Sequence, residues 1–269
     1  MIKTLRHPAS EQRSQASILI VLIGLLGLAA CDTTGVGGTS GSAENRAQRM
    51  ASNGDHDEAA GAYMGLAVGA VGTERDRYTL LAVEQYLDAG DVTRARSALR
   101  DVPRPSSGPL QPLWDTDRAA LYLYNGDADT ALDLLEPLSR QSLSQRDRLR
   151  VEVLRADAWI QKQYPTRAIE LMTQRETWLN SNRDVERNRA RLWQGLLVSS
   201  PTVLRDAAQT NTDPVVQGWL TISSIAASTG QQGVGWSNGL VRWRADNPNH
   251  PAMTVLGDLD LPEHLLLDY

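Results

Sequence analysis

The residue with the most definite chemistry in this sequence is Cys31, the only cysteine among 269 residues. It follows Leu28, Ala29 and Ala30, and small residues directly before a cysteine are typical of a lipobox, where a signal peptidase cleaves and the sulfur carries a lipid. A lone cysteine cannot form a disulfide within the chain. The chemistry expected at Cys31 is therefore lipidation, which would tether the protein to a membrane. The alternative is a plain thiol beside an uncleaved anchor.

The residues before Cys31 have the charge pattern of a signal peptide. Lys3, Arg6 and Arg13 precede an apolar run over residues 18–30. Such a run would extend about 20 Å as a helix, which is short of the roughly 30 Å core of a bilayer. Removing residues 1–30 takes away three basic and one acidic residue, so the net charge changes from −5 to about −7. An acidic mature chain is a poor partner for nucleic acid.

The histidines are the next candidates for chemistry, and each has a structural interpretation. His56 lies among acidic residues at a predicted helix start, where capping and the helix dipole favour carboxylates. His250 lies in a proline-bounded turn and is expected to hydrogen-bond the backbone, while His264 has only Glu263 nearby. Known catalytic and metal-binding sequence motifs do not occur. The sequence therefore predicts a protein that is not an enzyme and needs no cofactor and no metal.

Paired carboxylates and clustered tryptophans also favour structural roles. Asp115 and Asp117 are two residues apart, so on a helix they diverge and cannot act as a glycosidase pair. Trp236 and Trp243 share one helical stripe, which predicts core packing in preference to sugar binding.

The elements that would position these residues follow from a repeat. Gly-Asp pairs recur 36 residues apart, and a small alanine follows each pair, with a fourth copy one residue longer. The glycines are Gly54, Gly90 and Gly126, and the alanines are Ala59, Ala95, Ala131 and Ala168. Glycine ends one helix, the aspartate caps the next, and the alanine allows two helices to cross closely.

One such helix hairpin cannot bury both of its faces, so several must stack. The predicted fold is all-α: a tetratricopeptide-like solenoid of stacked helix hairpins over residues 43–269. Further helices are expected at 143–163, 185–198, 202–208, 215–227 and 234–243, with Pro201, Pro214 and Gly230 as breaks between them. Residues 31–42 are expected to hold the lipidated cysteine and a flexible Gly/Ser/Thr tether, after the signal peptide 1–30.

The closing segment carries the most specific pattern. Trp243 is followed by Asn247, Pro248, His250 and Pro251, with a Leu-Pro pair soon after. Together with the lipobox and the repeats, this segment resembles the amino-terminal half of the penicillin-binding-protein activator lipoproteins (LpoA, also called LppC). In that family an α/β domain follows the helical half, and the contact with the synthase is attributed to it. The sequence stops at Tyr269, about where that domain would begin, so this chain is expected to supply the anchor and the spacer arm.

The resemblance implies a lipoprotein on the periplasmic face of the outer membrane, although Asp32 after the lipidated cysteine marks inner-membrane retention in enteric bacteria. It also implies a non-enzymatic regulator of peptidoglycan synthesis that works through class A penicillin-binding proteins. Peptidoglycan or another periplasmic protein is a further candidate partner. The alternative function is a scaffold for outer-membrane assembly or for a cell-wall hydrolase complex.

Overall fold

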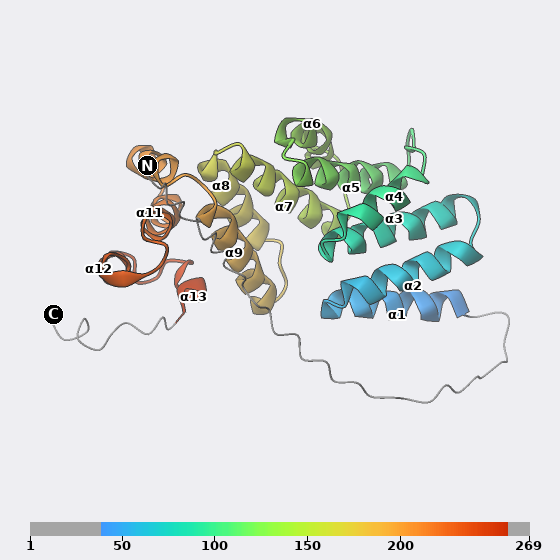
Figure 1. Ribbon diagram of the computed structural model, residues 1–269, viewed down its shortest axis with the longest axis horizontal. Helices are drawn as coiled ribbons and strands as arrows, with labels where there is room; N and C mark the ends of the chain where they lie inside the picture. The colour runs from blue at the N-terminus through green and yellow to red at the C-terminus, as the bar shows by residue number, and fades with distance from the viewer. Residues whose placement is uncertain (1–38, 258–269) are drawn as a thin grey trace, which may run out of the picture. The chain divides into compact units, whose positions relative to one another are not determined.

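The computed structural model describes residues 39–257, and every regular element in that range is an α-helix (Figure 1). The predicted all-α class is therefore confirmed. The first seven helices are α1 (Thr39–Asn53), α2 (His56–Gly69), α3 (Gly72–Asp88), α4 (Val92–Arg100), α5 (Leu110–Tyr124), α6 (Ala128–Ser139) and α7 (Gln145–Gln161). The others are α8 (Pro165–Glu176), α9 (Asn182–Leu197), α10 (Pro201–Thr210), α11 (Pro214–Thr229), α12 (Gly233–Asp246) and α13 (Met253–Leu256). Within this range none of the helices is both long and apolar enough to span a bilayer.

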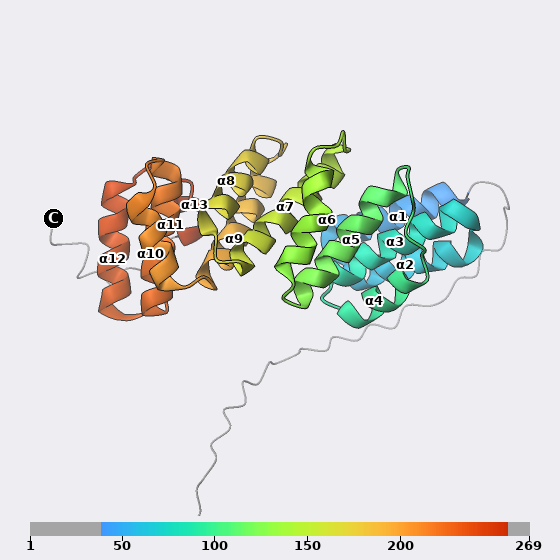
Figure 2. The same cartoon turned by 90° about the horizontal axis from the view of Figure 1, so that it is seen from above.

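The first eight helices pack as four consecutive hairpins, each made of two neighbouring helices. The first helices of successive hairpins also touch, since α3 packs on α5 and α5 packs on α7, and the pairs follow one another in chain order (Figures 1 and 2). This is the stacking that the repeat predicts. The pattern loosens after α8, because α10 lies mainly against α11 and α11 pairs with α12.

The four turns inside these hairpins have one geometry. Gly54, Gly90 and Gly126 adopt φ of 92°, 79° and 78°, the left-handed region that glycine tolerates best. In each turn the next amide donates to the carbonyl five residues earlier, at 2.8–3.0 Å. In the fourth turn Gln163 adopts φ 61° in place of glycine. Its side-chain oxygen accepts from the Ser200 amide at 2.7 Å, so this residue also ties the turn to the start of α10.

Aspartates after the glycines cap two of the helices that follow. Asp91 accepts from the Arg94 amide at 2.8 Å, and Asp127 accepts from the Thr130 amide at 3.1 Å. The expectation that Asp55 does the same is wrong, since its side chain makes no capping hydrogen bond. The neighbouring His56 contacts the following hairpin, with Nδ1 2.9 Å from the side-chain oxygen of Gln85 on α3.

The repeat alanines lie where the hairpin helices cross. Ala59, Ala95, Ala131 and Ala168 are all fully buried. The residues four positions later, among them Tyr63, are buried as well. A larger side chain at the alanine positions would push the two helices of a hairpin apart, which explains why small residues recur at that spacing.

Two hydrophobic cores meet at α7. Val151, Leu154 and Ala158 belong to the core of the first hairpins, whereas Ala156 and Ile160 belong to the core around α8 to α13. Because α7 buries opposite faces in the two cores, it joins the repeat region to the less regular half. The helix is two residues shorter at each end than the predicted 143–163, since Ser144 caps it by accepting from the Asp147 amide at 3.2 Å.

The predicted breaks mark helix ends. Pro201 and Pro214 are the first residues of α10 and α11. Proline is tolerated there because the backbone N–H that it lacks would have no partner within the helix. Gly230 ends α11 at φ 63°. At the amino-terminal end of the described residues, α1 begins at Thr39, inside the predicted tether of residues 31–42. Ala47 anchors this helix in the core of the first hairpins. The predictions for residues 1–30, Cys31, Asp32 and His264 fall outside the described residues.

The left-handed conformation of the turn glycines can be tested with a substitution and a matched control. Gly126→Ala places no atom against a neighbour, yet it forces a Cβ into the left-handed region. We expect it to lower the free energy of unfolding by about 1–2 kcal/mol. Gly61→Ala is equally unobstructed but lies inside α2, so it should raise that free energy by up to about 1 kcal/mol. Urea denaturation measures both, and equal effects at the two positions would contradict the turn assignment.

Candidate protein-binding groove

An inner groove runs along the first helices of the hairpins. One part, of about 510 Å³, is lined by residues of α1, α2, α3, α5 and α7. A second part, of about 420 Å³, is lined by residues of α3, α5, α7 and α9. His56 and Asp88 line both parts, so the two form one continuous groove. We call it the inner groove.

A network of charged side chains from three helices forms the wall of this groove. Arg150 on α7 donates to Asp117 on α5 at 2.9 Å and lies 2.8 Å from the Glu84 carboxylate on α3. Arg146 donates to the other Glu84 oxygen at 2.5 Å. The Asp117 side chain is fully buried, and that of Arg150 is 14% exposed. These ion pairs link three successive hairpins across the groove.

Burial and competing charges set the protonation of the network. Burial raises the pKa of Asp117 well above its usual range, and Arg150 opposes the rise only in part because Glu84 and Asp88 add negative charge. One Asp117 oxygen has no hydrogen-bond partner within the described structure. Burial also acts on Glu84, but the charges of Arg150 and Arg146 outweigh it and lower the Glu84 pKa. Arg150 and Arg146 together therefore satisfy both Glu84 oxygens, whereas only one of the two Asp117 oxygens has a partner.

Asp88 is the carboxylate of the network that faces the groove. Its side chain is 43% exposed, and its nearest guanidinium atom is Arg150 Nη1 at 3.9 Å. Burial of part of the side chain raises the Asp88 pKa, and Glu84 raises it further while Arg150 lowers it. Because Arg150 is already engaged by two other carboxylates, Asp88 offers a negative charge to whatever enters the groove.

Sequence reasoning missed this network. The prediction that the Asp115 and Asp117 side chains diverge is confirmed. Asp115 pairs with Arg104 at 2.8 Å, and Asp117 points inward to Arg150. The available signal was Glu84, a charge within a run of α3 that is otherwise largely apolar and buried from 78 to 87. Such a charge indicates a buried ion pair, but it does not identify the partners Arg146 and Arg150, which lie 62 and 66 residues further along the chain.

The closing motif lies away from the inner groove, beside the last hairpin. His250 is buried, its Nδ1 accepts from the Ala252 amide at 3.1 Å, and its Nε2 therefore carries the proton and donates to the Val215 carbonyl at 2.8 Å. This confirms the backbone role predicted for His250. Burial lowers its pKa, so the neutral ring is favoured. Asn247 donates to the Trp243 carbonyl at 2.9 Å and so ends α12, with Pro248 and Pro251 in the turn that follows.

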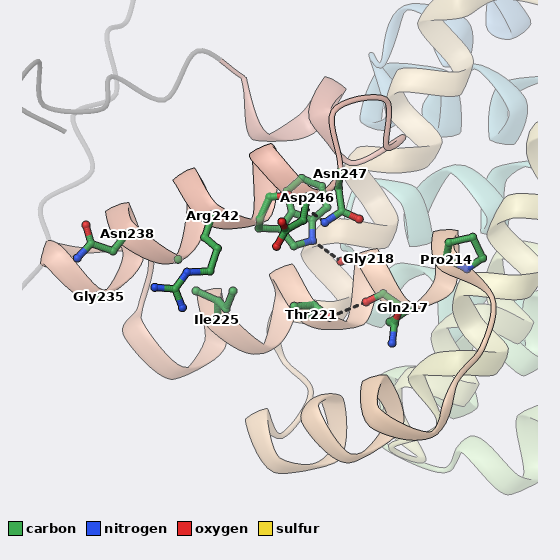
Figure 3. Close-up of a pocket in the computed structure, with 12 residues that line it drawn as sticks. Pro214, Gln217, Gly218, Thr221, Ile225, Gly235, Asn238, Arg242, Asp246 and Asn247 are labelled. Atoms are coloured by element: carbon green, nitrogen blue, oxygen red, sulfur yellow. Dashed lines mark hydrogen bonds between the residues drawn. The ribbon is translucent and has the colours of Figure 1, made fainter. Parts of the chain in front are cut away.

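Trp236 and Trp243 are core residues, as predicted, with 6% and 3% exposure. Figure 3 shows the cleft of about 650 Å³ between α11 and α12, with Thr221 and Ile225 from α11 and Arg242 from α12 among its lining residues. A dashed line there marks the bond from the Trp243 indole to the Gly218 carbonyl, 3.0 Å long. The cleft holds no group of three metal-ligating side chains, and neither does the rest of residues 39–257.

Residues 55–261 match the model of the LppC lipoproteins. The chain belongs to the LppC family. Its curated relatives include the penicillin-binding protein activator LpoA of Photobacterium profundum, which is 26% identical over 195 residues. LpoA of Vibrio vulnificus is 23% identical over 191 residues. The alignments cover 72% and 71% of this chain, which spans about a third of the length of these relatives, 32% in each case.

Solved structures share this fold. The LpoA N-terminal domain of Haemophilus influenzae matches this LppC chain with a TM-score of 0.57 and 20% identity, covering 78% of this chain and 93% of that domain. Full-length LpoA of the same organism matches with a TM-score of 0.56 and 18% identity over 74% of this chain and 37% of its own length. The helical fold expected from the resemblance is thus confirmed.

Proposed function

We propose that this LppC chain is a non-enzymatic, lipid-anchored scaffold that regulates peptidoglycan synthesis through a class A penicillin-binding protein, and that its inner groove adds a contact with that protein to the one attributed to the α/β domain. The relatives' name, penicillin-binding protein activator, supports the choice of partner. The observation that carries the choice of surface is the inner groove, which titratable side chains from successive hairpins line. Stacked helical repeats commonly present such concave surfaces to proteins.

The anchor belongs to the same proposal. Cys31 carries the lipid, residues 1–30 are removed, and the mature chain sits on the periplasmic face of the outer membrane, with the inner membrane as the alternative because of Asp32. Mass spectrometry of the amino-terminal peptide should show a diacyl or triacyl mass on Cys31. Cys31→Ser should release the protein from the detergent phase into the aqueous phase. An unmodified thiol on the exported protein would end this part of the proposal.

Binding to a purified class A penicillin-binding protein tests the partner and the surface together. We expect Asp88→Arg to weaken binding about tenfold, since it reverses the charge that the inner groove offers to the partner. Glu170→Arg is the matched control: it reverses an exposed carboxylate on α8, outside the groove. Surface plasmon resonance at two salt concentrations measures both variants.

The two parts of the proposal fail in different ways. If the unaltered protein binds the synthase no better than an unrelated lipoprotein does, the partner is wrong. If it binds but Asp88→Arg and Glu170→Arg behave alike, the inner groove is not the binding surface.

A scaffold of outer-membrane assembly or of a cell-wall hydrolase complex is the second candidate. Depletion of the protein would then reduce outer-membrane barrels or wall turnover while synthesis of peptidoglycan continues.

A further inference from the structure

A second groove lies on the other side of α5 and shares no lining residue with the inner groove. It has a volume of about 470 Å³ and is lined by the end of α4, the loop after it, α5 and α6. Trp114, Arg118 and Tyr122 recur every four residues, so they form one stripe of α5 along it. We call it the outer groove.

The floor of the outer groove is apolar and firmly held. Leu99 and Val102 are each 3% exposed, and Leu134 is partly buried beside them. The Trp114 indole nitrogen donates to the Val102 carbonyl at 3.0 Å, which uses its one polar atom and fixes the plane of the ring. Such a floor suits a flat apolar body that packs beside the tryptophan, because guanidinium groups already lie over the rings of Trp114 and Tyr122.

The rim of the outer groove carries arginines that lack carboxylate partners. Arg118 lies 4.8 Å above the Tyr122 ring and donates only to the phenol oxygen, at 3.2 Å. Arg100 makes no ion pair within the described part of the chain, although it lines the groove. Arg104, by contrast, is held by Asp115 at 2.8 and 3.1 Å. Asp133 is the one further acidic lining residue.

The charge of the outer groove therefore differs in sign from that of the protein. Three arginines face two carboxylates there, whereas the whole chain carries a net charge of −5. A guanidinium held over an aromatic ring keeps its donors available for a carboxylate, which accepts two parallel hydrogen bonds from it. The volume lies within the roughly 300–1,000 Å³ of small-molecule sites.

We propose that the outer groove binds a small organic anion that joins a flat, apolar ring body to one carboxylate. The ring body packs on the apolar floor beside Trp114, and the carboxylate accepts hydrogen bonds from Arg118 and Arg100. The site is independent of the inner groove and of the partner proposed for it, because the two surfaces lie on different faces of α5. A ligand here would make the protein responsive to a metabolite without blocking its docking surface.

Three probes that share one ring system test the chemistry: 2-naphthoate, its neutral amide 2-naphthamide, and the cation 2-naphthylmethylamine. The titrations use the purified full chain and follow its tryptophan indole N–H signals by NMR, with the Trp114 signal assigned from Trp114→Phe. We expect 2-naphthoate to shift the Trp114 signal in a saturable way, with a dissociation constant at least tenfold below that of the amide. The amine should not bind.

Two substitutions locate the carboxylate. Arg118→Gln should raise the dissociation constant of 2-naphthoate about tenfold. Arg100→Gln should also raise it, and because Arg100 makes no ion pair within residues 39–257, this variant stays folded. Arg140→Gln is the control: an exposed arginine at the end of α6 outside the groove, whose removal should change nothing. Equal binding of acid and amide, a shift confined to other tryptophans, or unchanged affinity in both groove variants would overturn the proposal.

Discussion

Arg150→Met is expected to lower the free energy of unfolding by about 3–5 kcal/mol, the cost of leaving buried charges without a partner. The substitution removes the guanidinium that lies 2.8 Å from Glu84 and 2.9 Å from Asp117. Arg146 still pairs with Glu84, but the fully buried Asp117 keeps no counter-ion. Urea denaturation at pH 7, followed by circular dichroism, measures the loss.

The matched control for this variant is Arg148→Met on the same helix. Arg148 is exposed, and its guanidinium lies 5.5 Å above the Trp178 ring without an ion pair. Its removal should cost less than about 1 kcal/mol. If both variants lose the same stability, the buried network contributes nothing specific to the fold.

The pH dependence of Arg150→Met gives a second readout. The pKa of Asp117 is already raised by burial, and the loss of Arg150 raises it further. A carboxyl whose folded-state pKa is raised binds protons more readily in the native state, so it costs stability as the pH rises through that pKa. The deficit of Arg150→Met should therefore shrink from pH 7 to pH 5. Adding Asp117→Asn should recover part of the loss at pH 7, because the orphaned charge is then gone.

The repeats and their turns could be predicted from the sequence because they depend on local chemistry. The conformational freedom of Gly90 and Gly126, and the capping oxygens of Asp91 and Asp127, act within a few residues of each other. Ala168 predicts the fourth hairpin even though Gln163 stands in place of the glycine. The close crossing of two helices requires a small residue more strictly than the turn requires a glycine. The all-α fold follows from these turns and from the helical spacing between them.

The inner groove could not be predicted, because it depends on which side chains meet across helices. Glu84, Asp117 and Arg150 are separated by tens of residues, and only the stacking angle of three hairpins brings them within hydrogen-bond distance. The same holds for His250, whose predicted backbone partner turns out to be Val215, 35 residues earlier. Sequence patterns identify the elements, while tertiary packing decides which of their polar groups share a site.

Gly218→Ala is the second substitution with a large expected effect. An added Cβ at Gly218 would lie 2.5 Å from His250 Nε2 and 2.6 Å from Cδ2. The ring cannot retreat, because its two nitrogens are hydrogen-bonded to Val215 and Ala252 and it makes T-shaped contacts with Trp219 and Trp243 at centroid distances of 5.6 and 5.1 Å. Overpacking a fixed site costs about 1–3 kcal/mol, and a broken buried hydrogen bond adds to it. We therefore expect a loss of about 2–4 kcal/mol.

A glycine on the facing helix supplies the control for Gly218→Ala. At Gly235 the nearest atom to an added Cβ is Thr229 Cγ2 at 3.4 Å, an ordinary contact. Gly235→Ala should therefore leave the stability unchanged or raise it by up to about 1 kcal/mol through helix propensity. Combining Gly218→Ala with His250→Ala removes the ring that the Cβ meets, so the double variant should lose less than the two single losses together. Additive losses would mean that the cost of Gly218→Ala does not come from the contact between its Cβ and His250.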